Sequence, residues 1–126
     1  MNEYVIAKYI RLSVDDTITE SLSISNQHLL LDRLIDEIES EMEMEELDTN
    51  TTITTLSFVD NGYTGTNMER PALQEMLELA TSGKINCIVV KDFSRFSRNI
   101  LESGYYIEQV FPLYRIRFIS IGDRFD

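Results

Sequence analysis

The chain has 126 residues, 43% of them hydrophobic, which suits a single domain with a buried core. Its formal net charge of −11 argues against a general nucleic-acid-binding surface, and its apolar runs are far too short to span a membrane. The single cysteine, Cys87, excludes an internal disulfide, and we interpret it as a small buried hydrophobe in a cytoplasmic protein.

The negative charge is concentrated in one segment. Residues Asp32 to Asp48 include nine acids and one arginine, which contribute −8 and leave −3 for the rest of the chain. A run of this kind is typical of a solvated helix end and loop. We therefore expect residues 41–51 to form an exposed extension or insertion. Because most of the negative charge lies in this one segment, the other surfaces of the protein need not be acidic.

The predicted elements alternate between strands and helices. Strands are expected at residues 4–12, 52–59, 86–91 and 116–121. Helices are expected at residues 24–40, from Pro71 to the stop at Gly83, and at 99–113. Their buried stripes are Ile24, Leu31, Leu34, Ile35 and Ile38; Leu73, Met76, Leu77 and Ala80; and Ile100, Ile107, Val110 and Phe111. This order predicts a three-layer α/β fold, with a mostly parallel four- to five-stranded sheet and helices on both faces.

Ser13 follows the first predicted strand, at the carboxyl edge where open α/β sheets build their sites. Arg11 lies two residues earlier, so strand alternation points its side chain the same way. A hydroxyl beside a guanidinium suggests a site in which the hydroxyl is a nucleophile and the guanidinium binds an anionic substrate. The alternative is that Ser13 is an ordinary turn or helix-capping residue.

Further arginines are placed at predicted element ends. Arg95 and Arg98 follow the third strand and are three residues apart, so they share a face on a helical turn. Arg70 precedes the helix that Pro71 opens. Together with Arg11, these guanidiniums suit the oxygens of one phosphate. The alternative is that they pair with the abundant surface acids.

Two polar residues are weaker candidates. Asp60 follows the second predicted strand, at the start of a turn-rich segment, and is either a solvent-exposed turn residue or a carboxylate that orients an arginine or handles a proton. Gln27 is either an ordinary helix surface residue or a donor to a phosphate or to Ser13. The chain lacks nucleotide-binding glycine motifs and a zinc-ligand set, and its single histidine argues against a Ser-His-Asp hydrolase. We expect no metal and no organic cofactor.

In order along the chain, these pieces resemble the catalytic domain of the serine recombinases, the resolvase/invertase family, and in particular its large transposon- and phage-type members. The matching segments are Tyr9 to Ser13, Ser21 to Gln27, Val59 to Asn67, Glu69 to Leu73 and Val89 to Asn99. Each segment alone is a weak signal, whereas the ordered set spans nearly the whole chain.

The resemblance implies a site-specific DNA recombinase. Ser13 would attack a DNA phosphodiester, form a 5′-phosphoserine link and release a 3′-hydroxyl. Arg11, Arg70, Arg95 and Arg98 match the active-site arginines of the family, and Asp60, Gln27 and Tyr9 match supporting positions. The general base is left unassigned because no histidine lies near Ser13 in the sequence.

The resemblance also implies partners. Full-length members bind specific DNA sites and assemble from dimers into synaptic tetramers. We therefore interpret residues 1–126 as the catalytic domain, with the dimer-forming helix and the DNA-binding domains outside it, and expect the isolated chain to be nearly inert on DNA. Ser94 departs from small resolvases, which often carry an acid there. The alternatives are a non-catalytic regulatory or oligomerisation module of the same fold and a flavodoxin-like domain that binds a phosphorylated ligand.

Overall fold

The computed structural model describes residues 2–12, 24–45, 51–61, 70–96 and 100–126. The elements follow one another in an alternating order that begins with a strand. They are β1 (Asn2–Leu12), α1 (Ile24–Glu45), β2 (Thr51–Asn61), α2 (Pro71–Thr81), β3 (Cys87–Val90), α3 (Phe93–Phe96), α4 (Ile100–Tyr105), η3 (Tyr106–Val110), α5 (Phe111–Leu113) and β4 (Arg117–Ser120).

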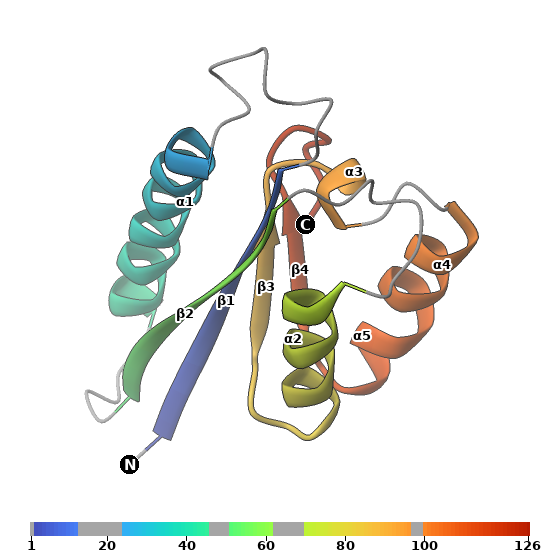
Figure 1. Ribbon diagram of the computed structural model, residues 1–126. Helices are drawn as coiled ribbons and strands as arrows, with labels where there is room; N and C mark the ends of the chain where they lie inside the picture. The colour runs from blue at the N-terminus through green and yellow to red at the C-terminus, as the bar shows by residue number, and fades with distance from the viewer. Residues whose placement is uncertain (1, 13–23, 46–50, 62–69, 97–99) are drawn as a thin grey trace.

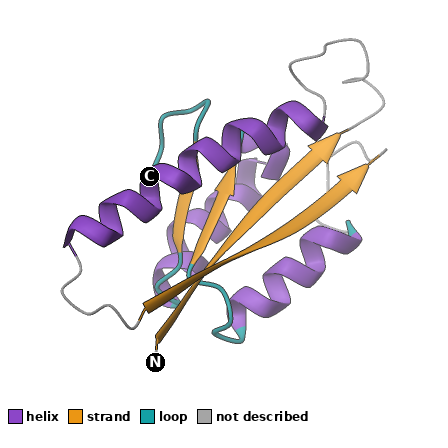
Figure 2. Ribbon diagram, turned by 90° about the vertical axis from the view of Figure 1, so that its left-hand side faces the viewer, coloured by secondary structure: helices purple, strands orange, loops and turns teal. Residues whose placement is uncertain are grey.

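The four strands form one sheet in the order β2-β1-β3-β4, and each neighbouring pair is parallel. Helix α1 covers one face, and α2 with α4 and α5 covers the other (Figures 1 and 2). The expected three-layer α/β fold is confirmed. Because the strands are parallel, their carboxyl ends meet at one edge, at the top of Figure 1.

Side chains of β1 alternate between the two cores, as the pleat of a strand requires. Val5, Ala7 and Tyr9 belong to the core on the α2 side, whereas Ile6 and Ile10 belong to the core on the α1 side. The stripes predicted for α1 and α2 lie in these cores. The members that are buried are Leu31, Ile35, Ile38, Leu73, Met76, Leu77 and Ala80, and Ile24 and Leu34 pack against these cores.

Helix α1 is longer than expected, since it continues to Glu45. Residues 41–45 therefore belong to the helix and are not a separate segment, although Glu41 and Glu43 are exposed as expected; Thr51 begins β2, and residues 46–50 lie outside the described part of the chain. The physical reason is Met42, which lies one helical turn after Ile38 and packs against the same core. Of the described helices, none is long and apolar enough to cross a membrane.

The predicted third helix at residues 99–113 is not one regular α-helix. Its described part starts at Ile100 and widens to a π-helix over Tyr106–Val110. The backbone N–H of Phe111 accordingly bonds to the carbonyl of Tyr106, five residues back. Pro112 is the next residue. A proline has no N–H to donate, and its ring clashes with the preceding turn of a regular α-helix. The widened turn accommodates that proline while Phe111 remains buried.

Cys87 begins β3 and is completely buried, as expected. Burial raises the pKa of its thiol from 9.0 to about 12.

We predict that a thiol reagent such as dithionitrobenzoate will not label Cys87 in the native chain at pH 8 and will label it rapidly in urea. Because the folded-state pKa is raised, the contribution of Cys87 to stability is complete below pH 9 and declines above it. Rapid native labelling would contradict this packing.

Candidate active site at the carboxyl edge of the sheet

Three of the four predicted arginines gather at the carboxyl edge of the sheet. Arg11 lies near the end of β1, Arg70 immediately precedes α2, and Arg95 lies in α3. Their residue exposures are only 0%, 1% and 4%. Burial of three guanidiniums in one region of an acidic protein is costly unless each is hydrogen-bonded, so their partners decide what the region can do.

Backbone carbonyl groups hold these arginines in place. Arg11 Nη2 donates to the Ser94 carbonyl at 2.9 Å. Arg70 Nη1 donates to the Arg95 carbonyl at 3.1 Å, and Arg70 Nη2 donates to the Phe96 carbonyl. Arg95 Nη1 donates in turn to the Arg11 carbonyl at 3.2 Å. Helix α3 is therefore the common anchor of the cluster.

A neutral carbonyl fixes a guanidinium without cancelling its charge. Arg95 also approaches a carboxylate, since its Nε lies 3.8 Å from Asp92 Oδ1. The contacts of Arg11 and Arg70 given above are with backbone carbonyls, whereas the alternative interpretation expects partners among the surface acids. Three guanidiniums at one edge concentrate positive charge there, and a phosphate is the kind of anion that forked guanidinium donors bind.

Tyr9 and Asp60 support Arg70 from the sheet. The Tyr9 hydroxyl donates to Asp60 Oδ2 at 2.8 Å, and the Arg70 guanidinium carbon lies 5.5 Å from the centroid of the Tyr9 ring. Burial raises the pKa of Tyr9 well above its usual value, so the hydroxyl stays protonated and acts as a donor. Burial lowers the pKa of Arg70, and the nearby Tyr9, Asp60 and Glu102 oppose that change. An arginine remains charged near neutral pH in this setting.

Asp60 also caps α2 from the neighbouring strand. Its carboxylate accepts the backbone N–H groups of Ala72 and Leu73, both at 3.0 Å. The residue at the N-cap position, Arg70, makes no side-chain cap of its own. The alternative of a solvent-exposed turn was wrong, because β2 continues to Asn61 and Asp60 is 3% exposed. Its cap fixes the backbone that carries Arg70.

Gln27 joins the site from the other face of the sheet. It lies in the first turns of α1, is completely buried, and donates through Nε2 to the Arg11 carbonyl at 3.1 Å. The same carbonyl accepts Arg95 Nη1. Gln27 is therefore not an ordinary helix surface residue. Its observed partner is the backbone two residues before Ser13, and contact with a phosphate or with Ser13 stays a prediction.

Ser13 and Arg98 lie outside the described residues, so their predicted roles stay predictions. Strand β1 ends at Leu12, the residue before Ser13. The described site therefore comprises six of the eight predicted residues. They are Tyr9, Arg11, Gln27, Asp60, Arg70 and Arg95, and the contacts above connect all six.

Sequence reasoning missed two carboxylates that hold α3. Asp92 Oδ1 accepts the Ser94 hydroxyl at 2.6 Å and the Arg95 N–H at 3.2 Å. Asp123 Oδ2 accepts the Phe93 N–H at 2.6 Å and the Ser120 hydroxyl at 2.7 Å. An Asp directly before a short helix is a recognisable capping signal for Asp92. No local signal marks Asp123, which is 30 residues from its partner Phe93.

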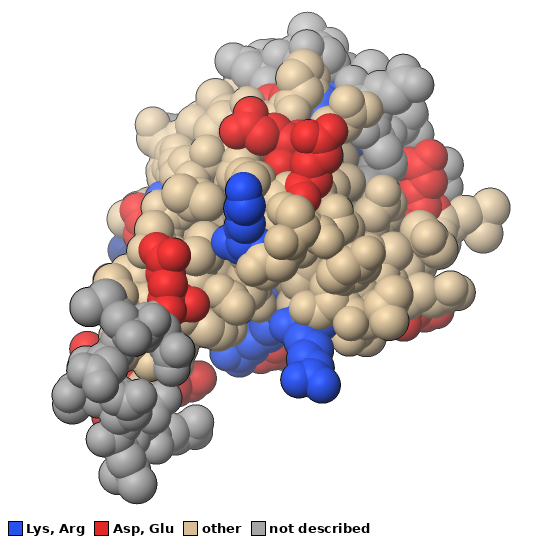
Figure 3. Space-filling model, turned by 90° about the horizontal axis from the view of Figure 1, so that it is seen from below, with Lys and Arg blue, Asp and Glu red and all other residues tan. Residues whose placement is uncertain are grey.

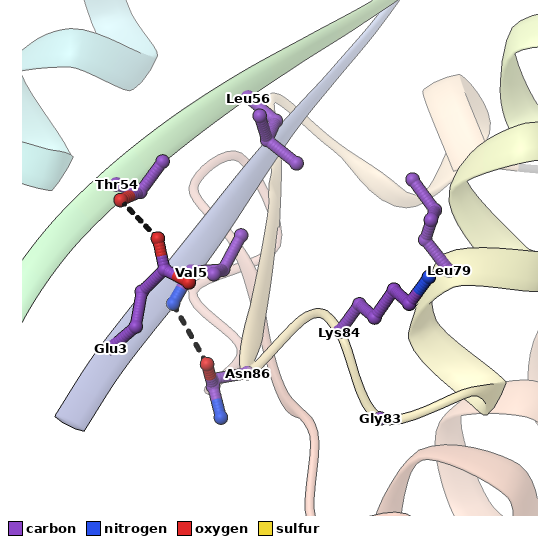
Figure 4. Close-up of a pocket in the computed structure, with 8 residues that line it drawn as sticks. All are labelled: Glu3, Val5, Thr54, Leu56, Leu79, Gly83, Lys84 and Asn86. Carbon is purple, nitrogen blue, oxygen red and sulfur yellow. Dashed lines mark hydrogen bonds between the residues drawn. The ribbon is translucent and has the colours of Figure 1, made fainter. Parts of the chain in front are cut away.

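A hollow of about 430 Å³ lies at the opposite, amino end of the sheet (Figure 4). It is lined by Glu3, Val5, Thr54, Leu56, Leu79, Gly83, Lys84 and Asn86. In it the Glu3 carboxylate accepts a hydrogen bond from the Thr54 hydroxyl, and the side-chain Oδ1 of Asn86 accepts one from the Val5 N–H. Figure 3 shows this end of the molecule with basic and acidic side chains interspersed. The gathering of arginines belongs to the carboxyl edge.

Comparison with known proteins identifies the family. The model of the family described as Resolvase, N terminal domain, matches residues 6–126. The N-terminal catalytic domain of TP901-1 integrase is similar in structure, with a TM-score of 0.65 and 24% identity over 95% of this chain and 78% of that one. No curated protein matches the chain.

Two other solved structures share the fold. The catalytic domain of ISC1926 TnpA, an IS607-like serine recombinase, gives a TM-score of 0.57 at 16% identity and covers 94% of this chain and 70% of that one. A serine recombinase from Sulfolobus solfataricus gives 0.51 at 21% identity and covers 95% and 69%. These likenesses establish the fold, and the family match covers nearly the whole sequence. The chain therefore belongs to the resolvase family and has the fold of a serine recombinase catalytic domain.

Proposed function

We propose that this chain is the catalytic domain of a site-specific recombinase that cuts and rejoins DNA with Ser13 as its nucleophile. The observation that carries the proposal is the cluster of Arg11, Arg70 and Arg95 at the end of β1. Hydrogen bonds to backbone carbonyls bring these three guanidiniums together at this edge of the sheet. The strand that contributes Arg11 ends at Leu12, one residue before the proposed nucleophile.

The proposed reaction exchanges one phosphate ester for another. Ser13 Oγ loses its proton to a base that is not yet identified and bonds to phosphorus, the bond from phosphorus to the 3′ oxygen breaks, and that oxygen takes up a proton. The products are a 5′-phosphoserine and a free 3′-hydroxyl. A second 3′-hydroxyl reverses the step after strand exchange. Because the two esters are similar in energy, no nucleotide hydrolysis is needed, and the arginines stabilise charge on the phosphate oxygens.

We propose DNA as the substrate despite the net charge of −11. Much of that charge lies on the described part of α1, where Asp32, Asp36, Glu37, Glu41 and Glu43 are exposed. The arginine cluster lies at the carboxyl edge on the α2 side of the sheet, since Arg11 follows Tyr9 by two residues on β1. In this proposal, DNA affinity and synaptic assembly come chiefly from dimer-forming and DNA-binding parts beyond residues 1–126, as in the family.

Trapping a covalent adduct tests the function directly. The natural polypeptide that carries residues 1–126 is incubated with labelled duplexes that span the sequences flanking its gene, each nicked so that the cut end diffuses away. We predict a protein–DNA adduct that survives denaturation and whose peptide carries phosphate on Ser13. Ser13→Ala is expected to abolish the adduct, because alanine offers no nucleophilic oxygen.

A matched serine variant provides the control. Ser25 is exposed on α1, so Ser25→Ala removes a hydroxyl without touching the arginine cluster. It should form the adduct at the parent rate. If Ser13→Ala still cleaves, the assignment of the nucleophile is wrong. If the parent protein binds its site and never forms an adduct, the alternative of a regulatory module with the same fold is favoured.

A further inference from the structure

The last residues of the chain form a turn that lies against the start of α3 (Figure 1). After β4, the N–H groups of Ile121 and Gly122 bond to the carbonyls of Val90 and Lys91. The chain then reverses, and Phe125 pairs with Ser120 in an antiparallel bridge. We call residues 120–125 the C-terminal turn. It extends the β3–β4 pairing directly to the segment that enters α3.

The C-terminal turn is closely fitted to that segment. A Cβ atom at Gly122 would lie 2.9 Å from the Lys91 carbonyl oxygen, which is too close for any other residue without a shift. The ring of Phe125 lies edge-on to that of Phe93, with centroids 5.5 Å apart. The backbone of residues 91–93 and the ring of Phe93 are therefore both in contact with the turn.

Asp123 is the polar link between the turn and α3. One carboxylate oxygen, Oδ2, accepts the Phe93 N–H at 2.6 Å and the hydroxyl of the buried Ser120 at 2.7 Å. Phe93 is the first residue of α3. Ser120 is the last residue of β4, so this carboxylate ties the start of the short helix to the rigid sheet.

Helix α3 connects Asp123 to the arginine cluster. The carbonyls of Ser94, Arg95 and Phe96 accept hydrogen bonds from Arg11 and Arg70, and Arg95 itself reaches the Arg11 carbonyl. The described residues of α3, Phe93–Phe96, thus contact Arg11, Arg70 and the C-terminal turn, and these contacts outside the helix contribute to its orientation.

We infer that Asp123 is a positioning residue for the proposed active site. It fixes the start of α3 and thereby the carbonyl groups that orient Arg11 and Arg70. The inference rests on the proposed function for its catalytic consequence, whereas its structural consequence can be measured separately. Asp123 is exposed and makes hydrogen bonds of modest worth, so its loss should leave the chain folded.

The test compares Asp123→Ala with Asp123→Asn. Both remove one negative charge, and the asparagine carbonyl oxygen still accepts the Phe93 N–H and the Ser120 hydroxyl. The first readout is amide hydrogen exchange of residues 93–96 and binding of inorganic phosphate to the chain, both followed by NMR. The second readout is the rate of strand cleavage and the DNA affinity of the natural polypeptide.

We expect Asp123→Ala to accelerate exchange in α3, weaken phosphate binding and lower the cleavage rate by about 10- to 100-fold, the scale of a small misplacement of catalytic groups. DNA affinity should be unchanged, and Asp123→Asn should behave like the parent in every readout. Unaltered α3 exchange in Asp123→Ala would overturn the inference. So would an equal loss of cleavage in both variants, which would point to charge alone.

The inference and the proposed function fail in different ways. If Asp123→Ala loosens α3 and weakens phosphate binding while the parent forms no Ser13 adduct, positioning is supported and the recombinase chemistry is contradicted. If the adduct forms at Ser13 and Asp123→Ala cleaves at the parent rate, the chemistry stands and positioning is overturned. Asp36→Ala, at an exposed position of α1, is the matched control for the loss of an acidic side chain.

Discussion

Replacing Arg70 by alanine is expected to lower the free energy of unfolding by about 3–5 kcal/mol. The substitution leaves the carbonyls of Arg95 and Phe96 without these donors and removes the cation that lies over the Tyr9 ring. It also leaves space at a position that is 1% exposed. Since a domain of this kind is stable by only about 5–15 kcal/mol, the loss should be plain in urea unfolding followed by circular dichroism.

Two variants separate the contacts of Arg70 from its charge. Arg70→Lys keeps the charge but has one ammonium group in place of a fork, so it should satisfy only part of the two-carbonyl contact and lose an intermediate amount of stability. Arg33→Ala removes a charge from an exposed position of α1 and should change the unfolding free energy little. If Arg70→Ala unfolds at nearly the parent urea concentration, Arg70 does not anchor α3.

Much of the fold was predictable because its signals are local. The apolar stripes of α1 and α2 have helical spacing, and Pro71 and Gly83 bracket α2, where Gly83 adopts a φ of 82° that favours glycine. The order of strands and helices then leads to a parallel sheet. The errors lie where a local rule competes with packing: Met42 extends α1 into an acidic segment, and Pro112 is accommodated by a π-turn.

The identities of the site residues were easier to predict than their partners. Strand ends and element order place Arg11, Arg70 and Arg95 at one edge, which the structure confirms. Their acceptors are carbonyl groups, which every residue carries, so no sequence pattern singles them out. Arg70 is 25 residues from the Arg95 carbonyl, and Arg11 is 83 residues from that of Ser94. These pairs form only because α3 packs against the end of β1 in the folded chain.

Asp60 illustrates the same limit for a side chain. Read locally, it begins a turn-rich segment and suggests solvent exposure. In the fold it lies opposite Arg11 in the parallel register of β1 and β2 and accepts hydrogen bonds from Tyr9, Ala72 and Leu73. One sequence clue was present, since Arg70 is a poor capping residue and the first N–H groups of α2 needed an acceptor.

Replacing Arg95 by alanine is expected to lower the rate of DNA strand cleavage by about 10²–10³-fold. The predicted effect on the unfolding free energy is small, about 1–2 kcal/mol. The reason is the way the cluster is anchored: Arg70 binds the backbone carbonyl of residue 95, which alanine retains. The Arg95 side chain donates to the Arg11 carbonyl, and its Nε lies 3.8 Å from Asp92. The measurements are single-turnover cleavage by the natural polypeptide and urea unfolding of the same variant.

Comparing the Arg95 and Arg70 variants tests whether Arg95 serves mainly cleavage while Arg70 also stabilises the fold. Arg70→Ala should lose stability and cleavage together, whereas Arg95→Ala should lose cleavage with most of its stability kept. Arg95→Lys should recover part of the rate, because it restores the charge without the forked geometry. A normal cleavage rate in Arg95→Ala would remove this residue from the proposed phosphate site. Parallel losses of stability and rate would instead show that its guanidinium serves the fold, leaving Arg11 and Arg70 as the described arginines able to act on the phosphate.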